Sequence, residues 1–277
     1  MVFPQVIAGF NALVNAIGLP MNLLVILTIA LERRLHMMRY VLLASLAASD
    51  FLCLILTNSF HIGSIAQERW LYGQTMCQLN PSFKRYFYLN TVLHLIAISY
   101  DRYIAIVKSP MTYYGTISKI RVVFTTFIWI APIPLSIGPF VGWGQYVYNP
   151  EVFYCEQGWS VKDDSVGRRA VIFITFLAPV LVIVFLSWSV FKTAQTLQHN
   201  VIQVGSIDGS DLSESQLQEM SRRRSERKAA VDVCIIIAAF LVCFLPGWAV
   251  GVYRQFYREV PAEVILVTNV IFFISTL

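Results

Sequence analysis

Charged residues are scarce in this chain of 277 residues, in which Asp, Glu, Lys and Arg together make up 13%. A soluble domain carries about 25% charged residues. Hydrophobic residues make up 57% of the chain, and the mean hydropathy is +0.63. Seven apolar windows hold this excess, and most of them reach the length of about 20 residues that a helix needs to cross a bilayer. The sequence therefore predicts an all-α, multi-pass protein of the lipid bilayer, with windows at about 3–31, 40–66, 86–107, 122–142, 170–191, 233–253 and 264–277.

Enzyme signatures are also missing from the sequence. It has no His, Cys, Asp and Glu cluster at metal-ligand spacing, no glycine loop for phosphate and no Gly-x-Ser-x-Gly elbow. No internal repeat occurs, which argues against a transporter built from inverted repeats. His61 and His94 stand alone on apolar segments, where packing is their expected role. We therefore expect no enzymatic turnover.

Lys and Arg are distributed unevenly between the two sides of the predicted bundle. With the N-terminus outside, the inner side carries twelve of these residues and the outer side eight. This bias agrees with the rule that cytoplasmic loops are the more basic ones. The net charge of +5 therefore indicates membrane topology rather than nucleic-acid binding.

One seven-transmembrane domain is expected over residues 1–277, with two long connections. The outer loop 143–169 is rich in aromatic and acidic residues, as expected for a lid over a ligand site, and the inner loop 192–228 is polar and then basic. The last window is still apolar at Leu277. We expect the seventh helix to be cut short there.

Cysteine positions predict one disulfide. Cys77 and Cys155 both lie on the predicted outer side, where oxidation is permitted. Cys53, Cys234 and Cys243 lie within apolar windows and are expected to be free thiols. A bridge between the first two would join the head of the third helix to the outer loop.

Ionisable residues inside the apolar windows are few, and each is costly, at about 2.5–3.5 kcal/mol on insertion scales. They include Asp50 and the adjacent pair Asp101 and Arg102. Lys84 lies 18 residues before Arg102, which is five turns at about 3.6 residues per turn. Both therefore point to one side of the helix, together with Thr91, and we expect this side to face the bundle interior. In the simplest interpretation, Asp101 and Arg102 only neutralise each other at the membrane interface.

Together these features resemble a rhodopsin-like (class A) G-protein-coupled receptor over the entire chain. The resemblance implies a receptor in the plasma membrane that senses an extracellular ligand and activates a heterotrimeric G protein. The motifs that carry it are Asn22 with Val25, Leu-Ala-Ala-Ser-Asp at 46–50, Asp101-Arg102-Tyr103, Trp129, Phe176 with Pro179, and Phe240, Cys243, Phe244 and Pro246.

The resemblance also implies an activation switch. Glu226, twenty residues before Pro246, stands where the family has an acidic partner for Arg102. Pro246 would kink the sixth helix, whose outward movement would open a cavity for the G protein. In the alternative interpretation, Glu226 only neutralises the arginines around it. The implied switch residues are Asp101, Arg102, Tyr103, Pro179, Glu226, Phe240, Phe244 and Pro246.

Some positions depart from the family pattern. Phe244 replaces a tryptophan, Ser187 stands where many members have a tyrosine, and the chain ends before an Asn-Pro-x-x-Tyr motif. Two other functions therefore remain open: a receptor-like binding protein that does not couple, and an ion transporter or channel that uses Asp50 and Arg102.

Asp50 stands where the family binds a sodium ion, and the resemblance implies that Asn22 and Thr91 line the same polar core. The alternative is a protonated Asp50 that is hydrogen-bonded to Asn22. No other cofactor is expected.

The ligand side of the resemblance rests on Lys84. Amine receptors have an aspartate seven residues after the outer cysteine of the third helix, and that position is Lys84 here. A cationic amine is therefore disfavoured, and an anionic ligand is favoured. Alternatively, Lys84 pairs internally with Glu156 or Glu263. Residues 261–277 contain no lysine for retinal, so a photopigment is not expected. The candidate ligand contacts are Lys84, Tyr88, Phe176 and Phe244.

Overall fold

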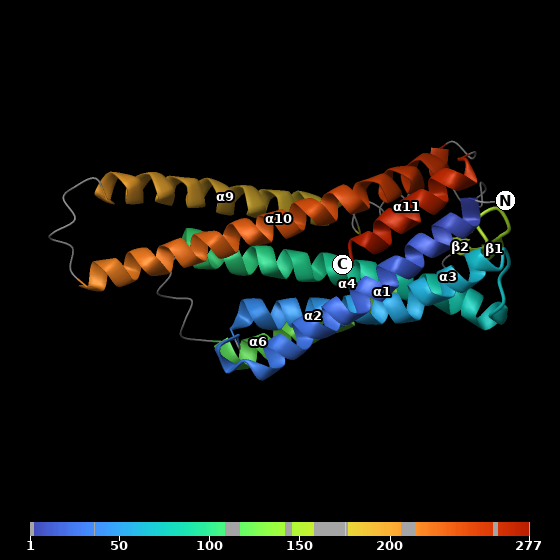
Figure 1. Ribbon diagram of the computed structural model, residues 1–277, viewed down its shortest axis with the longest axis horizontal. Coiled ribbons are helices and arrows are strands. Elements are labelled where there is room, and N and C mark those ends of the chain that lie inside the picture. The colour runs from blue at the N-terminus through green and yellow to red at the C-terminus, as the bar shows by residue number, and fades with distance from the viewer. Residues whose placement is uncertain are drawn as a thin grey trace.

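Long helices lie side by side in the computed structural model of this chain (Figure 1). It describes residues 3–35, 37–108, 117–141, 146–157, 175, 177–205, 214–256 and 260–276. The main helices are α1 (Phe3–Leu31), α2 (Met38–Cys53), α3 (Ser59–Ala66), α4 (Gly73–Tyr103), α6 (Ile117–Ile130), α7 (Ile133–Ser136), α9 (Ala178–Gly205), α10 (Glu214–Phe256) and α11 (Ala262–Ile274).

Short turns of other helix types complete these elements. The 3₁₀ turns are η1 (Arg33–Leu35) and η4 (Gly138–Val141), and the wider π turns are η2 (Leu54–Asn58) and η3 (Ile104–Lys108). Because η2 joins α2 to α3 without a break, the two helices form one continuous span. Within the described residues, each of the seven apolar windows thus overlaps one helix or several consecutive helices.

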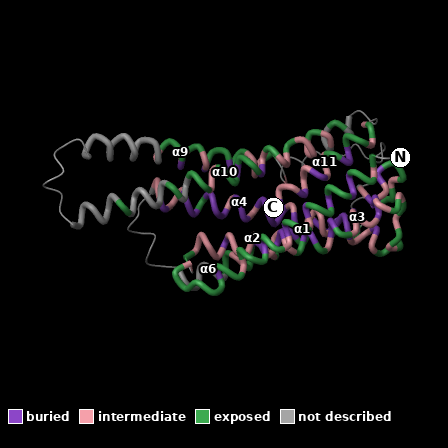
Figure 2. Tube along the Cα trace, viewed as in Figure 1, coloured by how far each residue is buried: buried purple, intermediate pink, exposed green. Residues whose placement is uncertain are grey.

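Three of the described helical segments are long and apolar enough to cross a membrane: Phe3–Leu31, Met38–Ala66 and Val231–Val250. Shorter apolar helical segments occur at Val123–Ser136, Ala178–Thr193 and Ala262–Ile274. Large apolar side chains are exposed along the outward faces of these helices (Figure 2), as expected for surfaces that contact lipid.

Helix α4 runs through the middle of the bundle, and its buried positions extend over its entire length (Figure 2). Val92 and Leu95 of α4 pack against Ile183 of α9 and Phe240 of α10. One turn further along, Ala97 and Ile98 of α4 pack with residues of α2 and α6. Side chains on α4 can therefore contact most of the other helices.

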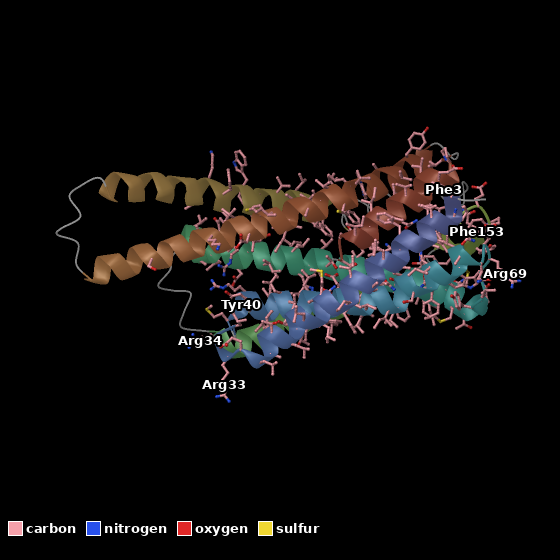
Figure 3. The ribbon with its side chains drawn as sticks, viewed as in Figure 1. Phe3, Arg33, Arg34, Tyr40, Arg69 and Phe153 are labelled. Carbon is pink, nitrogen blue, oxygen red and sulfur yellow. A yellow bond between two sulfur atoms is a disulfide. The ribbon has the colours of Figure 1, made fainter. Side chains whose placement is uncertain are left out.

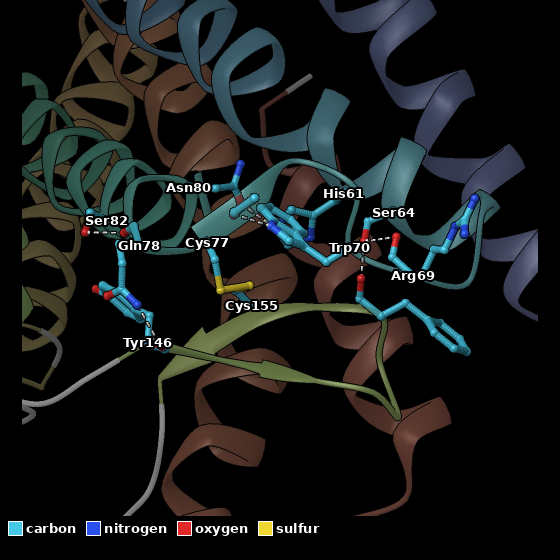
Figure 4. Close-up of a disulfide and its surroundings, with 12 residues drawn as sticks. His61, Ser64, Arg69, Trp70, Cys77, Gln78, Asn80, Ser82, Tyr146 and Cys155 are labelled. Atoms are coloured by element: carbon cyan, nitrogen blue, oxygen red, sulfur yellow. Dashed lines mark hydrogen bonds between the residues drawn. A yellow bond between two sulfur atoms is a disulfide. The ribbon is translucent and has the colours of Figure 1, made fainter. Parts of the chain in front are cut away.

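A β-hairpin covers one end of the bundle. Strands β1 (Tyr146–Asn149) and β2 (Tyr154–Gln157) pair antiparallel, and Cys155 of β2 forms a disulfide with Cys77 of α4 (Figure 4). The predicted disulfide is thus confirmed. No hairpin was predicted in the outer loop, but the rest of the described fold is helical as expected.

The two ends of the bundle differ in character (Figure 3). Phe3, Arg69 and Phe153 lie at the end with the disulfide, whereas Arg33 and Arg34 lie at the opposite end. Disulfides form in oxidising compartments outside the cytosol. The end that holds the start of α1 is therefore the outer end, in agreement with the predicted orientation.

Candidate functional site

A buried ion pair lies near the inner end of α4. Nε of Arg102 donates a hydrogen bond of 3.0 Å to Oδ2 of Asp101, and Nη2 of Arg102 forms a salt bridge to the same oxygen. The Arg102 side chain is only 1% exposed. Removing one partner from such a pair leaves a buried charge uncompensated, which costs about 3–5 kcal/mol. The arrangement therefore holds Arg102 in one position unless another group takes over the charge.

Other predicted switch residues lie on the expected elements. Tyr103 is partly buried at the end of α4, Pro179 lies in the first turn of α9, and Pro246 lies inside α10. The Glu226 side chain and the whole of Phe176 fall outside the described part of the structure. The Arg102–Glu226 pair therefore stays a prediction.

Parallel aromatic rings connect α4 to α10 in the outer half of the bundle. The ring of Tyr88 stacks on that of Phe244 with centroids 4.4 Å apart, and Phe244 in turn lies parallel to Phe240 at 5.5 Å. Phe272 of α11 meets Phe244 edge-on at 6.2 Å. The phenol of Tyr88 donates to the carbonyl of Thr175 over 3.1 Å. A ligand that displaced Tyr88 would therefore also disturb Phe244, two residues before Pro246.

Asp50 is 7% exposed on α2, and the hydroxyl of Thr91 donates to its Oδ1 over 3.4 Å. Among the described residues, no Lys, Arg or His lies within ion-pair distance of this carboxylate. The amide of Asn22 donates instead to the carbonyls of Gly18 and Thr276, at 3.0 and 2.8 Å. Nδ2 of Asn22 thus joins α1 to the turn that follows α11, and a hydrogen bond from a protonated Asp50 to Oδ1 of Asn22 stays a prediction.

Hard oxygen donors at Asp50 and Thr91 suit a hard cation such as sodium. Within the described ranges, no three His, Cys, Asp or Glu side chains come together as a metal site. The donor set thus fits a monovalent ion that is held by one carboxylate, a hydroxyl and water.

The ammonium group of Lys84 lies in a cage of aromatic rings and one amide. Nζ donates a hydrogen bond to Oδ1 of Asn269, and it lies 5.0 Å from the ring centroid of Phe272 and 5.2 Å from that of Phe273. Cations are attracted to aromatic faces at such distances. Lys84 points to the interior, as its helical spacing predicted.

The alternative interpretation gave Lys84 an internal partner in Glu156 or Glu263, and the Glu156 carboxylate does attract the Lys84 charge. Neither Glu156 nor Glu263 forms a salt bridge with Nζ. Glu156 instead accepts a hydrogen bond of 2.6 Å from Nδ2 of Asn149, across the hairpin. An amide, aromatic rings and the more distant Glu156 charge therefore stabilise the Lys84 ammonium group, and a ligand carboxylate could still form a direct ion pair with it.

Asn269 extends this site to the outer hairpin. Its Nδ2 donates to the hydroxyl of Tyr154 and, over 2.9 Å, to the carbonyl of Ile265. Tyr154 is 3% exposed and packs with α1, α3 and α11. The chain Lys84–Asn269–Tyr154 thus connects α4, α11 and β2. Sequence reasoning missed Asn269 and Tyr154, although an asparagine in the last apolar window and a tyrosine next to Cys155 were available signals.

The N-terminal strand of the hairpin rests on α4. Nε2 of Gln78 donates to the backbone carbonyl of Tyr146 over 2.8 Å. The Tyr146 side chain is buried, and this burial raises the pKa of its hydroxyl above the ordinary value, while nearby Arg85 opposes the shift. The Tyr146 phenol therefore stays protonated at neutral pH.

His61 and His94, which were expected to have packing roles, also form hydrogen bonds. Nε2 of His94 lies 2.8 Å from Oγ of Ser45, which also accepts a hydrogen bond of 2.9 Å from the indole of Trp129. This contact ties α2, α4 and α6 together. His61 contacts Asn80 over 3.1 Å between Nε2 and Oδ1.

Comparison with known proteins places this geometry in context. The family model described as "7 transmembrane receptor (rhodopsin family)" matches residues 21–277. The crystal structure of squid rhodopsin superposes with a TM-score of 0.84 over 99% of this chain and 79% of that one, at 20% identity. This second likeness establishes the fold.

Curated relatives include several receptors. The octopamine receptor beta-1R of Drosophila melanogaster is 29% identical over 258 residues, which cover 87% of this chain and 50% of that receptor. Human melanopsin is 28% identical over 244 residues, with 86% and 50% coverage. Trace amine-associated receptor 8a of Rattus norvegicus is 31% identical over 259 residues, with 86% and 69% coverage. The chain spans about half the length of the first two.

Proposed function

Because the chain belongs to the rhodopsin family of seven-transmembrane receptors, the class A G-protein-coupled receptors, we propose that it senses an extracellular ligand and activates a heterotrimeric G protein by outward movement of α10. Members of this family are multi-pass plasma-membrane receptors and not enzymes. The buried Arg102–Asp101 pair at the inner end of α4 is the observation that carries the proposal. An arginine held in this way is a charge that a conformational change can release.

The proposed movement needs a path from the ligand to the inner end of α10. The Tyr88–Phe244–Phe240 stack supplies one. It joins α4, in the outer half of the bundle, to the part of α10 that precedes Pro246. Proline inside a helix removes a backbone hydrogen bond and permits a bend at that point. To reverse a 1:99 ratio of states, the ligand must favour the active state by about 5.5 kcal/mol. Breaking one buried charge pair costs a free energy of the same order, about 3–5 kcal/mol.

The ligand class we propose is a molecule with an anionic group that pairs with Lys84. Several relatives are named as octopamine, 5-hydroxytryptamine or trace-amine receptors. A ligand ammonium would be repelled by the Lys84 charge, so their named ligands do not transfer to this chain. Melanopsin is a relative as well, but residues 261–277 contain no lysine for a retinal linkage.

We further propose that Asp50 and Thr91 hold a sodium ion that favours the inactive state. A cation there would neutralise the one deeply placed carboxylate in α2 and would bridge α2 to α4. Its removal on activation would couple the middle of the bundle to movement of the helices.

Coupling is tested by measuring nucleotide exchange on a panel of G-protein α subunits in membranes that contain the receptor or lack it. Exchange above the level of empty membranes, for at least one α subunit, supports the proposal. Sodium flux through receptor-containing liposomes that Asp50→Asn abolishes, without any exchange, would point to transport instead. Specific ligand binding without exchange would identify a receptor that does not couple.

A further inference from the structure

The π turn η2 orients a buried amide on the neighbouring helix. Nδ2 of Asn80 donates to the carbonyls of Leu56 and Thr57, at 3.1 and 3.3 Å. Only the amide nitrogen can donate to carbonyls, so its orientation is fixed. Oδ1 of Asn80 therefore faces His61, whose Nε2 lies 3.1 Å away.

This arrangement assigns the tautomer of His61. An amide oxygen only accepts hydrogen bonds, so Nε2 of His61 must carry the hydrogen. In a neutral imidazole the other nitrogen, Nδ1, then keeps its lone pair and acts as an acceptor. His61 is 2% exposed, and Nδ1 is buried with no hydrogen-bond partner among the described residues. A buried acceptor without a donor is unfavourable, so a donor from a bound molecule would stabilise it.

Lys84 and His61 contact the same two aromatic rings. The His61 ring stacks on Tyr154 with centroids 4.4 Å apart and meets Phe273 edge-on at 5.5 Å. Nζ of Lys84 lies 6.0 Å from the centroid of Tyr154 and 5.2 Å from that of Phe273. Ring stacking leaves the lone pair of Nδ1 unused, because that lone pair lies in the imidazole plane.

We propose that Nδ1 of His61 and Nζ of Lys84 form one recognition site for a small ligand that carries an anionic group together with a hydroxyl or amide donor. Lys84 pairs with the anion, and His61 accepts the donor. The inference rests on the proposed ligand class, and it adds a second polar requirement. Hydroxy-carboxylates are the simplest compounds that meet both conditions.

Tyr154 holds the two halves of this site together. Its ring covers a face of His61, its hydroxyl accepts from Asn269, and Asn269 accepts from Lys84. The next residue is Cys155, and its disulfide to Cys77 fixes the strand beside His61 and Asn80 (Figure 4). A purely structural role for His61 needs only the Nε2 hydrogen bond to Asn80, which a glutamine could also donate.

The test uses matched carboxylates and the full-length receptor in lipid nanodiscs. The pairs are 3-phenylpropionate with 2-hydroxy-3-phenylpropionate, and butyrate with 3-hydroxybutyrate. Binding is measured as the ligand-induced shift in the thermal unfolding temperature. We expect the hydroxylated member of at least one pair to bind about tenfold more tightly, as one additional hydrogen bond to a buried acceptor allows.

Two variants separate the roles of the residues. His61→Gln keeps a donor for Asn80 and removes the ring acceptor. The affinity for the hydroxylated member should therefore fall to about that of the parent carboxylate, which should bind as before. Lys84→Met should abolish binding of both members. If His61→Gln fails to fold, His61→Asn, which retains an acceptor near the Nδ1 position, should preserve the preference.

Three outcomes would overturn the inference: equal binding of both members of every pair, a preference that survives in His61→Gln, or no binding by any probe. If both members of each pair bind equally and Lys84→Met abolishes this binding, the role of His61 is contradicted but the proposed anionic ligand class is retained. Absence of all binding overturns that class as well. Coupling to a G protein is measured separately, as nucleotide exchange without ligand.

Discussion

Nζ of Lys84 donates a hydrogen bond to Oδ1 of Asn269, and this contact joins the centre of α4 to α11 in the outer half of the bundle. Among the described residues, no carboxylate forms a salt bridge with this ammonium group. The proposed ligand anion would form a direct ion pair at this position.

Lys84→Met should reduce the affinity for an anionic ligand by at least tenfold, since a charge-assisted hydrogen bond is worth about 1.5–3 kcal/mol. It also leaves Oδ1 of Asn269 without a donor, so the thermal unfolding temperature should fall. Lys192→Met, on the exposed surface of α9, is the control. Unchanged affinity in Lys84→Met, measured by radioligand or thermal-shift titration, would contradict the proposed ligand class.

The outer disulfide closes a loop with a sequence separation of 78 residues. Loss of a native disulfide from a loop of this size destabilises a protein by about 2–5 kcal/mol. Cys77→Ser and Cys155→Ser should each lower surface expression and thermal stability, and the double variant should resemble the single ones. Additive losses in the double variant would mean that the two thiols act separately.

Phe153 adopts a left-handed backbone conformation, with φ at 63°. For a side chain with a Cβ this region is unfavourable by about 1–2 kcal/mol, and glycine avoids that strain. Phe153→Gly should therefore be more stable than Phe153→Ala, although both lose the ring. Thermal unfolding of the two variants side by side measures the difference. Equal or reversed stabilities would show that the turn is not strained at this residue.

Sodium should stabilise the wild-type receptor more than an equal concentration of choline. A ligand that binds only the folded state raises stability with its concentration. In Asp50→Asn the sodium-dependent increase should disappear, because the carboxylate donor is gone, whereas Ser45→Ala, which alters a different polar contact on α2, should retain it. A sodium effect of equal size in Asp50→Asn would place the ion elsewhere.

The sequence predicted the helices well because a membrane imposes long apolar windows, and it predicted the disulfide because only two cysteines lay on the outer side. It did not predict the hairpin, whose strands of four residues each carry too little periodicity. It also did not predict Asn269 of α11 as the hydrogen-bond partner of Lys84, because that contact depends on how α4 and α11 pack together.

His61 was expected only to pack, and its hydrogen bond to Asn80, which depends on the π turn η2, was not predicted. One extra residue in that turn leaves carbonyls available to Asn80, which then orients the imidazole. Hydrogen bonds of this kind depend on the tertiary arrangement of α3 and α4. A single histidine in an apolar window gives no sign of them.

The most direct test of the proposed switch compares basal G-protein activation by wild type and Glu226→Ala at equal surface expression. If Glu226 shares Arg102 with Asp101, its removal should free the arginine and raise basal nucleotide exchange several-fold. Glu214→Ala, at the first residue of α10, is the control and should leave basal exchange unchanged. Equal basal exchange in wild type and Glu226→Ala, with every α subunit tested, would contradict a latch between α4 and α10.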